Sequence, residues 1–214
     1  MRIVITGASR GIGAELAARY AARGDEVIGT STRGGTLLPL DLSQAAPDFA
    51  PLLTAVAGGP VDLLICNAGV YLDKGHGLED GFGADLWARS MAVNVAGPFL
   101  TVQALLPALR QSQSARVAVI ASAMGSQARA PGGSYTYRAS KAAAVNVARN
   151  LAQDLKGAVA VGAYHPGWVR TDMGGSGADI SVEASAQGLM ARFDALSPAT
   201  SGCFESYDGT PVPF

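Results

Sequence analysis

Tyr137 and Lys141 are the two residues whose types and spacing most directly suggest acid–base chemistry. Residues four apart on a helix project from the same face, one turn apart. A phenol with a pKa of about 10 is a poor acid at neutral pH, and a nearby ammonium favours the phenolate. We therefore expect Lys141 to lower the pKa of Tyr137 and Tyr137 to act as a proton donor. Tyr135 lies on another helical face and is expected to be a pocket-wall or packing residue.

A glycine-rich turn near the start of the chain could hold an anion. The run Thr6-Gly7-Ala8-Ser9-Arg10-Gly11-Ile12-Gly13 separates a predicted strand from a predicted helix. Glycines let a phosphate approach the backbone, and the free N–H groups and dipole of a helix N-terminus favour the anion. Any tight strand-to-helix turn uses glycine, so this motif needs support from the rest of the chain.

The elements that must position these groups alternate between short apolar runs and longer helical patterns. This alternation predicts an α/β fold, a single Rossmann-type doubly wound parallel sheet with helices on both faces, forming one domain over residues 1–214. The predicted strands are 2–6, 26–30, 37–40, 61–66, 116–121, 159–164 and 203–207. The predicted helices are 12–23, 47–56, 84–112, 134–156 and 182–196, with Pro98 and Pro107 expected to bend or break the third.

The second and third predicted strands are separated only by residues 31–36. A crossover helix between parallel strands needs more residues than this. Either a helix has been lost here, or the third strand is not a parallel neighbour of the second.

Further motifs occur in a fixed order along the chain. They are Asp41-Leu42 after the third strand, Cys66-Asn67-Ala68-Gly69 after the fourth, Asn94 inside the long helix, Ser122 after the fifth strand, and Pro166-Gly167-Trp168-Val169-Arg170-Thr171 after the sixth. Together with T-G-x-x-x-G-x-G and Y-x-x-x-K, this set resembles the short-chain dehydrogenase/reductase family over nearly the whole chain. By its length and the run from Ser134 to Lys141, the chain is most similar to the small members related to C-factor and sniffer-type carbonyl reductases.

The resemblance implies a nicotinamide dinucleotide bound by the glycine turn and by residues at the ends of the following strands. The residues expected to bind it are Gly7, Ser9, Arg10, Gly11, Ile12, Gly13, Arg33, Asp41, Leu42, Asn67, Ala68, Gly69, Tyr137, Lys141, Pro166, Gly167, Val169 and Thr171. The resemblance also implies that Lys141 bonds the nicotinamide ribose. Cys66 stands where the family has the first Asn of N-N-A-G, so the bonds of that Asn are absent or replaced.

The catalytic residues implied by the resemblance are Asn94, Ser122, Tyr137 and Lys141. Ser122 is expected to stabilise the substrate oxygen as charge develops, with Ser126 as a possible substitute; the alternative is an ordinary serine at a strand end. A kink at Pro98 could free the carbonyl of Asn94 to hold a water linked to Lys141; the alternative is packing or capping.

The choice between NAD and NADP depends on the end of the second predicted strand. NAD-dependent proteins of this architecture place an acidic residue there, about 20 positions beyond the glycines, on the ribose 2′-OH. Here the strand ends in Ser31-Thr32-Arg33. Arg33, helped by Arg10, could pair with a 2′-phosphate, unless both are solvated surface residues. We therefore expect NADP as the cofactor.

These features predict NADPH-dependent reduction of a small or medium aldehyde or ketone to an alcohol. Trp87, Tyr135, Trp168 and Met173 could supply an apolar wall for the substrate. The alternative from another class is a non-catalytic NADP-binding regulatory or signalling protein, whose expected mark, damage to the Tyr/Lys pair, is missing here.

Composition limits the remaining possibilities. A net charge of −1 without a Lys/Arg cluster argues against nucleic acid and an anionic membrane, and no apolar run approaches the roughly 18 residues of a spanning segment. The N-terminus lacks the pattern of a secretory signal, and two cysteines are expected to stay free in a cytoplasmic protein. With only His76 and His165, no metal site is expected. The two long helices, rich in small and apolar residues, are expected to form a homodimer or homotetramer.

Overall fold

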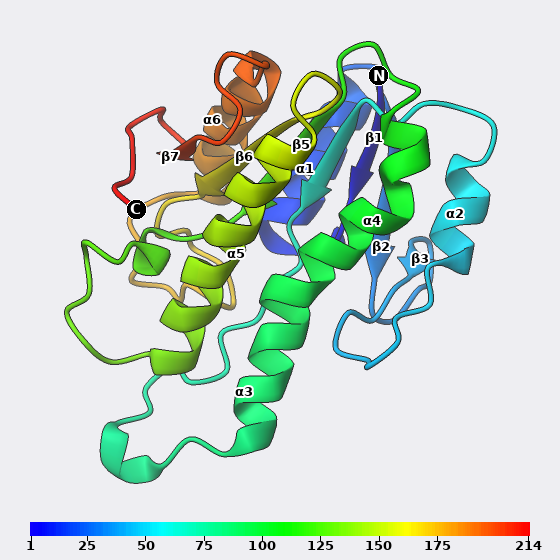
Figure 1. Ribbon diagram of the computed structural model, residues 1–214. Helices are drawn as coiled ribbons and strands as arrows, with labels where there is room; N and C mark the ends of the chain where they lie inside the picture. The colour runs from blue at the N-terminus through cyan, green and yellow to red at the C-terminus, as the bar shows by residue number, and fades with distance from the viewer.

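The computed structural model describes residues 1–214, and its strands form one sheet in the order β3-β2-β1-β4-β5-β6-β7 (Figure 1). Every neighbouring pair is parallel. The strands are β1 Arg2–Ile5, β2 Glu26–Ser31, β3 Leu38–Pro39, β4 Leu63–Cys66, β5 Arg116–Ile120, β6 Ala160–His165 and β7 Phe204–Ser206. The order reverses between β1 and β4, and in such sheets ligands bind outside the carboxyl ends of the strands at this point.

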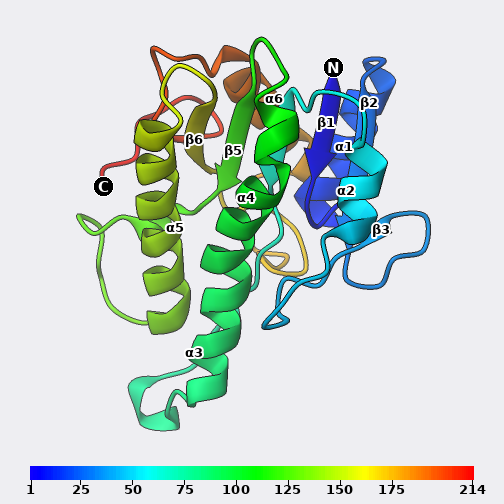
Figure 2. The same cartoon turned by 45° about the vertical axis from the view of Figure 1, so that its right-hand side comes forward.

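Helices cover both faces of the sheet, as predicted (Figure 2). Those on one face are α1 Gly11–Ala22 and α6 Val182–Ala195, and those on the other are α2 Ala50–Val56, α4 Gly97–Leu109 and α5 Tyr135–Asp154. Each face has its own apolar core because strand side chains alternate between the faces. Ile5, Leu16 and Phe193 belong to the core of the first face, and Leu105 and Ala148 to the core of the second.

The connection between β2 and β3 has lost its crossover helix. Thr30 pairs with Leu38 in parallel register, so β3 is a parallel neighbour and the first of the two sequence interpretations is correct. Residues 32–37 turn back through Gly34 and Gly35, whose φ angles of 66° and 83° lie in the left-handed region that glycine tolerates.

The long helix predicted over 84–112 bends where Pro98 was expected to act. It consists of α3 Ala84–Met91, a π-helical turn η2 Ala92–Ala96, and α4. Pro98 has no N–H to donate to the carbonyl of Asn94 four residues earlier, which accounts for a locally widened turn at this place. Pro107 does not break the helix; it lies in the last turn of α4.

By length and composition, the helical stretch Ala84–Leu109 is apolar enough to cross a membrane, and half of its most apolar window is buried within the fold. The expectation that no stretch approaches this length is therefore wrong by this criterion. Much of the apolar character has a structural reason, since Val102, Leu105 and Leu109 on α4 are buried in the core.

Candidate active site

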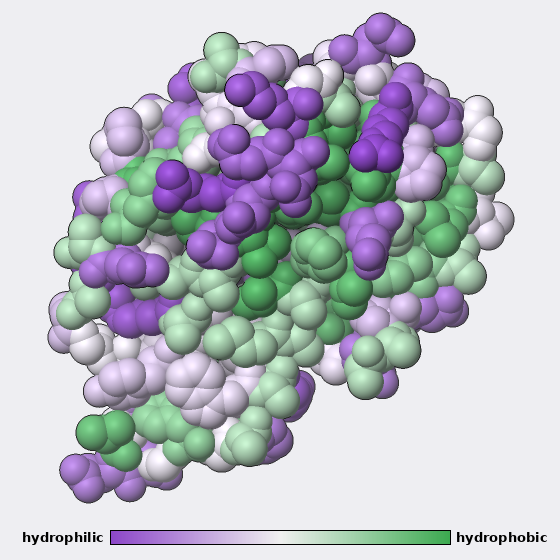
Figure 3. Space-filling view, viewed as in Figure 1, coloured by the Kyte–Doolittle hydropathy of each residue, from purple (hydrophilic) through white to green (hydrophobic).

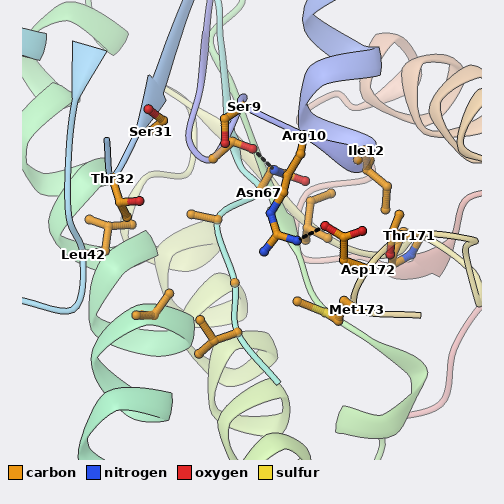
Figure 4. A pocket seen from close by; sticks show the side chains of 18 of the residues that line it. Ser9, Arg10, Ile12, Ser31, Thr32, Leu42, Asn67, Thr171, Asp172 and Met173 are labelled. Carbon is orange, nitrogen blue, oxygen red and sulfur yellow. Dashed lines mark hydrogen bonds and ion pairs between the residues drawn. The ribbon is translucent and has the colours of Figure 1, made fainter. Parts of the chain in front are cut away.

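A cleft of about 760 Å³ opens at the carboxyl ends of the strands, where the strand order reverses (Figure 4). Its lining includes the ends of β2 and β5, the loops after β1, β3, β4 and β6, and helix α5, so residues far apart in the sequence meet there. Fourteen of the predicted residues line it: Gly7, Ser9, Arg10, Gly11, Ile12, Asp41, Leu42, Asn67, Ala68, Gly69, Tyr137, Lys141, Pro166 and Thr171. Gly13, Arg33, Asn94, Ser122, Gly167 and Val169 do not.

The glycine turn between β1 and α1 is shaped for close approach. Gly7 has a φ of 68°, and a Cβ there would lie 2.9 Å from Cα of Ala68. A Cβ on Gly13 would lie 2.5 Å from Nδ2 of Asn67, so this third glycine allows packing rather than lining the cleft. Arg10, the N-cap of α1, makes no side-chain cap bond, which leaves the helix N-terminus to an anion. These residues fit a dinucleotide pyrophosphate.

Thr6 and Asn67 tie the two loops at the reversal point together. Nδ2 of Asn67 donates to the carbonyls of Thr6 and Gly7 at 3.1 and 2.9 Å. Oγ1 of Thr6 accepts the backbone N–H groups of Asn67 and Ala68, both at 3.1 Å. The floor of the cleft is thus cross-linked by four hydrogen bonds between the loop after β1 and the loop after β4.

The adenosine end of the cleft lacks the acidic residue typical of NAD sites. Ser31 and Thr32 line it at the end of β2. Arg33 is exposed and lies outside the lining, because the chain turns away at Gly34 and Gly35. The predicted contact from Arg33 is therefore not supported by its position.

Arg10 lines the cleft but forms an ion pair with Asp172, 2.5 Å from Nη1 to Oδ2 (Figure 4). Both side chains are largely exposed, at 70% and 79% of their surface, so the pair contributes little to stability. The pair joins the glycine turn to the loop after β6 across the mouth of the cleft. Asp172, Arg89 and Arg170 also line the cleft, and sequence reasoning missed all three because no local pattern marks them.

Tyr137 and Lys141 are both buried and both line the cleft, at 8% and 4% exposure. Nζ of Lys141 lies 5.7 Å from the centre of the Tyr137 ring and donates to the carbonyl of Ile120 at 2.8 Å. One helical turn of α5 therefore places an ammonium beside a phenol in the same cleft as the glycine turn.

The effect of Lys141 on Tyr137 differs from the expectation. Burial raises the pKa of Tyr137 to about 12, while a hydrogen bond from Ser122 lowers it and the nearby Tyr71 and Asp73 raise it further. Burial also lowers the pKa of Lys141 to about 8. The predicted lowering of the phenol pKa by Lys141 is thus not found: desolvation dominates the pKa of Tyr137, and Nζ of Lys141 donates to the carbonyl of Ile120.

Ser122 and Asn94 stand behind the cleft rather than in its lining. Ser122 ends β5, caps the short helix η3 Ala123–Gly125 by accepting the N–H of Met124, and also reaches Tyr137. The side chain of Asn94 bonds both backbone groups of Val70 at 2.9 Å and donates to Oγ of Ser140 at 2.9 Å. Asn94 therefore links the loop after β4 to α5, as the packing alternative expected. The water relay through its backbone carbonyl stays a prediction.

Cys66, which departs from the family pattern, and His165, which ends β6, both have pKa values set by burial. Cys66 is fully buried in β4, where burial raises the pKa of its thiol to about 12, and its nearest polar partner is the carbonyl of Pro98 at 4.0 Å. Burial lowers the pKa of His165 to about 4, so its imidazole is neutral at pH 7. Neither residue lines the cleft.

Of the predicted apolar wall, only Met173 lines the cleft. Trp168 and Tyr135 are exposed at 53% and 41%, and Trp87 lies outside the lining. The apolar lining at the catalytic end comes instead from Val70, Leu72 and Ile120. Val70 and Leu72 follow β4 and Ile120 ends β5, so this lining belongs to segments that are hydrogen-bonded to α5 directly or through Asn94.

Comparison with known proteins agrees with this geometry. Residues 38–179 match the sequence model of the short chain dehydrogenase family. C-signal of Myxococcus xanthus is 45% identical over 168 residues, which are 75% of this chain and 97% of that protein. The chain belongs to the short-chain dehydrogenase/reductase family of oxidoreductases.

Two solved structures superpose on the whole chain. One is an NADPH-bound carbonyl reductase from chicken fatty liver, with 25% identity and a TM-score of 0.90, covering 100% of this chain and 98% of that one. The other is the carbonyl reductase Sniffer of D. melanogaster, with 25% identity and a TM-score of 0.88, covering 100% and 99%. The resemblance to C-factor and sniffer-type members, and the fold it implied, are confirmed.

Proposed function

We propose that this protein is a carbonyl reductase that uses NADPH to reduce a small or medium aldehyde or ketone. The observation that carries the proposal is one cleft lined both by the glycine turn at Gly7 and by the buried pair Tyr137 and Lys141. A dinucleotide whose pyrophosphate meets the N-terminus of α1 would extend along the cleft toward Tyr137. The NADPH-bound relative from chicken supports this choice of cofactor.

Bound NADPH would supply the hydride that reaches the carbonyl carbon. The chain's own residues align the reactants and handle the proton. Tyr137 protonates the carbonyl oxygen, and Ser122, beside it, donates a hydrogen bond to the same oxygen as its negative charge grows. Lys141 places a positive charge 5.7 Å from the ring centre of the phenolate that remains. The buried site strengthens each of these interactions because little water competes for them.

Preference for NADPH over NADH is assigned to Arg10, with the hydroxyls of Ser31 and Thr32 beside it. A 2′-phosphate would compete with Asp172 for the guanidinium of Arg10. No carboxylate at the end of β2 would repel that phosphate, since β2 and the residue after it contribute only Thr30, Ser31 and Thr32 to the lining. The carboxylate of Asp41, after β3, is bonded to Ser43 and Gln44.

The decisive experiment follows NADPH oxidation with a panel of aldehydes, diketones and quinones, using the wild type and Tyr137→Phe. We expect turnover that falls at least 100-fold in the variant, with a much smaller change in the affinity for NADPH because the aromatic ring is kept. Equal turnover in both proteins would rule out Tyr137 as the acid. Tight NADPH binding without turnover of any carbonyl would favour the regulatory alternative.

The proposal extends to the assembly and location of the protein. Association into a homodimer or homotetramer through α4 and α5 is supported by the apolar surface between these helices (Figure 3) and by Phe99 on α4, exposed at 42%. A cytoplasmic location fits the free thiols of Cys66 and Cys203, and subcellular fractionation tests it.

A further inference from the structure

We propose that Asp73, which does not line the cleft, positions Tyr137 by capping helix α5 from the loop after β4. The inference rests on the proposed function, in which Tyr137 is the proton donor. Asp73 lies 64 residues before Tyr137, and no sequence motif draws attention to it.

Helix α5 has no cap of its own. Its N-cap residue, Ser134, has a left-handed backbone with φ of 48°, and its side chain makes no cap hydrogen bond. The first N–H groups of a helix need acceptors from elsewhere. Oδ2 of Asp73 accepts the N–H of Thr136 at 2.8 Å and that of Tyr137 at 3.4 Å. These are the second and third helical residues, which an N-cap side chain ordinarily serves.

The cap is a buried carboxylate, with no exposed surface. A buried charge is costly unless it is bonded, and the second oxygen, Oδ1, has no hydrogen-bond partner in the protein. Ser134 is a residue type that ordinarily caps a helix at lower cost, but its hydroxyl bonds Tyr71 instead of the helix N–H groups. A cap from Asp73, unlike one from Ser134, also fixes the start of α5 relative to the loop after β4. Val70 and Leu72 of this loop line the cleft.

Tyr71, two residues before Asp73, holds the other part of Tyr137. Its ring stacks on the Tyr137 ring with centroids 4.2 Å apart and planes 19° apart. Its hydroxyl bonds Oγ of Ser134 at 2.5 Å, at the residue that begins the helix. The segment 71–73 therefore constrains both the backbone and the ring of the proton donor.

The charge of Asp73 also acts on the phenol. The groups that face Tyr137 are Lys141 on α5, Ser122 after β5, and Tyr71 and Asp73 after β4. Asp73 raises the pKa of Tyr137. Removing the carboxylate charge should lower that pKa, so reduction, which needs the protonated phenol, should decline at a lower pH than in the wild type.

The test compares Asp73→Ala, which removes the acceptor, with Asp73→Asn, which keeps an acceptor and removes the charge. The control is Asp62→Ala: Asp62 accepts the backbone N–H of Arg2 at 2.8 Å at the opposite end of β4. We expect kcat to fall roughly 10- to 100-fold in Asp73→Ala with KM for NADPH within about twofold. Asp73→Asn should keep kcat within about threefold, with its pH profile displaced downward, and Asp62→Ala should keep the wild-type kcat.

Amide hydrogen exchange at residues 135–138 gives a second readout that does not require turnover. Exchange there should accelerate in Asp73→Ala and stay near the wild type in Asp73→Asn. The proposal is overturned if Asp73→Ala keeps both wild-type kcat and wild-type exchange, if Asp73→Asn is impaired as severely as Asp73→Ala, or if Asp62→Ala lowers kcat equally. A wild type that reduces no carbonyl would refute the proposed function, and the exchange pattern would still decide whether Asp73 caps α5.

Discussion

At the scale of single residues, burial determines the electrostatics of the catalytic pair more than the pair itself does. Burial disfavours the charged form of each side chain. It therefore raises the pKa of Tyr137 to about 12 and lowers the pKa of Lys141 to about 8. At neutral pH the cleft thus holds a neutral phenol beside an ammonium whose pKa is lowered to about 8. A cationic nicotinamide ring after hydride transfer would favour the phenolate, which ties proton release to the state of the cofactor.

The depressed pKa of Lys141 predicts a pH-dependent stability cost. Below about pH 8 Lys141 is charged in both the folded and the unfolded state, and burying the charge destabilises the folded state. Between about pH 8 and 10.5 the unfolded chain binds more protons than the folded one, so the free energy of unfolding rises with pH. Lys141→Met should remove this rise. Measured by urea unfolding, its stability relative to the wild type should fall by on the order of 2 kcal/mol from pH 7 to pH 10. Parallel pH profiles for the two proteins would contradict the burial of a charged Lys141.

Arg10 and Arg33 allow a matched test of cofactor preference. Arg10 lines the cleft and Arg33 is exposed outside it. Arg10→Ala should raise KM for NADPH about tenfold and leave KM for NADH nearly unchanged, since a charge-assisted hydrogen bond is worth roughly 1.5–3 kcal/mol and this side chain is exposed. Arg33→Ala should change neither value. Steady-state kinetics with both cofactors measure this. An equal increase in KM for NADPH in the two variants would show that Arg33 also binds the 2′-phosphate.

At the scale of elements, the short helix η3 is seated directly on α5. A Cβ on Gly125 would lie 2.6 Å from the carbonyl carbon of Lys141 and 2.8 Å from the nitrogen of Ala142. The absence of a side chain is what allows the segment after Ser122 to contact the helix that carries Lys141.

Gly125→Ala should therefore destabilise the fold by about 1–3 kcal/mol, because the backbone of α5 cannot yield easily. It should also lower kcat by displacing Ser122 from Tyr137. Gly177→Ala is the matched control, since its Cβ would meet only Trp168, at 4.0 Å. Thermal unfolding and kinetics of both variants measure the effect; equal melting temperatures would show that η3 can move away without cost.

The elements were predictable where they depend on local patterns, and less so where they depend on distant contacts. Apolar runs identified every strand, helical patterns identified the α-helices, and Pro98 identified the place where the π-helical turn interrupts the helix before α4. The sequence left open whether β3 is parallel, because only the pairing of Thr30 with Leu38 decides it. The cap by Asp73 was missed for the same reason: a carboxylate 62 residues before the helix start at Tyr135 leaves no trace in local spacing.

At the scale of the whole molecule, the ordered motifs converge on one cleft, so most predicted cofactor contacts are at its lining. The residues that failed to reach it did so for geometric reasons. Arg33 is carried away by a glycine turn, and Gly13 is needed for packing against Asn67. The depth of burial of Tyr137, and hence the direction of its pKa, cannot be read from helical spacing because it depends on segments from β4 and β5.

Association of whole chains is tested at the apolar face between α4 and α5. Phe99→Arg should move the mass in sedimentation from a multiple of 21.7 kDa toward that of one chain, because a buried unpaired charge opposes association. Leu53→Arg on α2, exposed to the same 42%, should leave the assembly unchanged. A sedimentation mass of one chain for the wild type at micromolar concentration would contradict the proposed homodimer or homotetramer.

The four hydrogen bonds between Thr6 or Gly7 and the Asn67–Ala68 segment form within the protein alone. The surface on which the pyrophosphate would rest is therefore already rigid before any nucleotide arrives, and little backbone entropy remains to be lost on binding. Calorimetry can compare the binding of adenosine 2′,5′-bisphosphate with that of complete NADPH. The heat-capacity change of binding should scale with the apolar area that each molecule covers. It should lack the additional decrease that accompanies the folding of a loop.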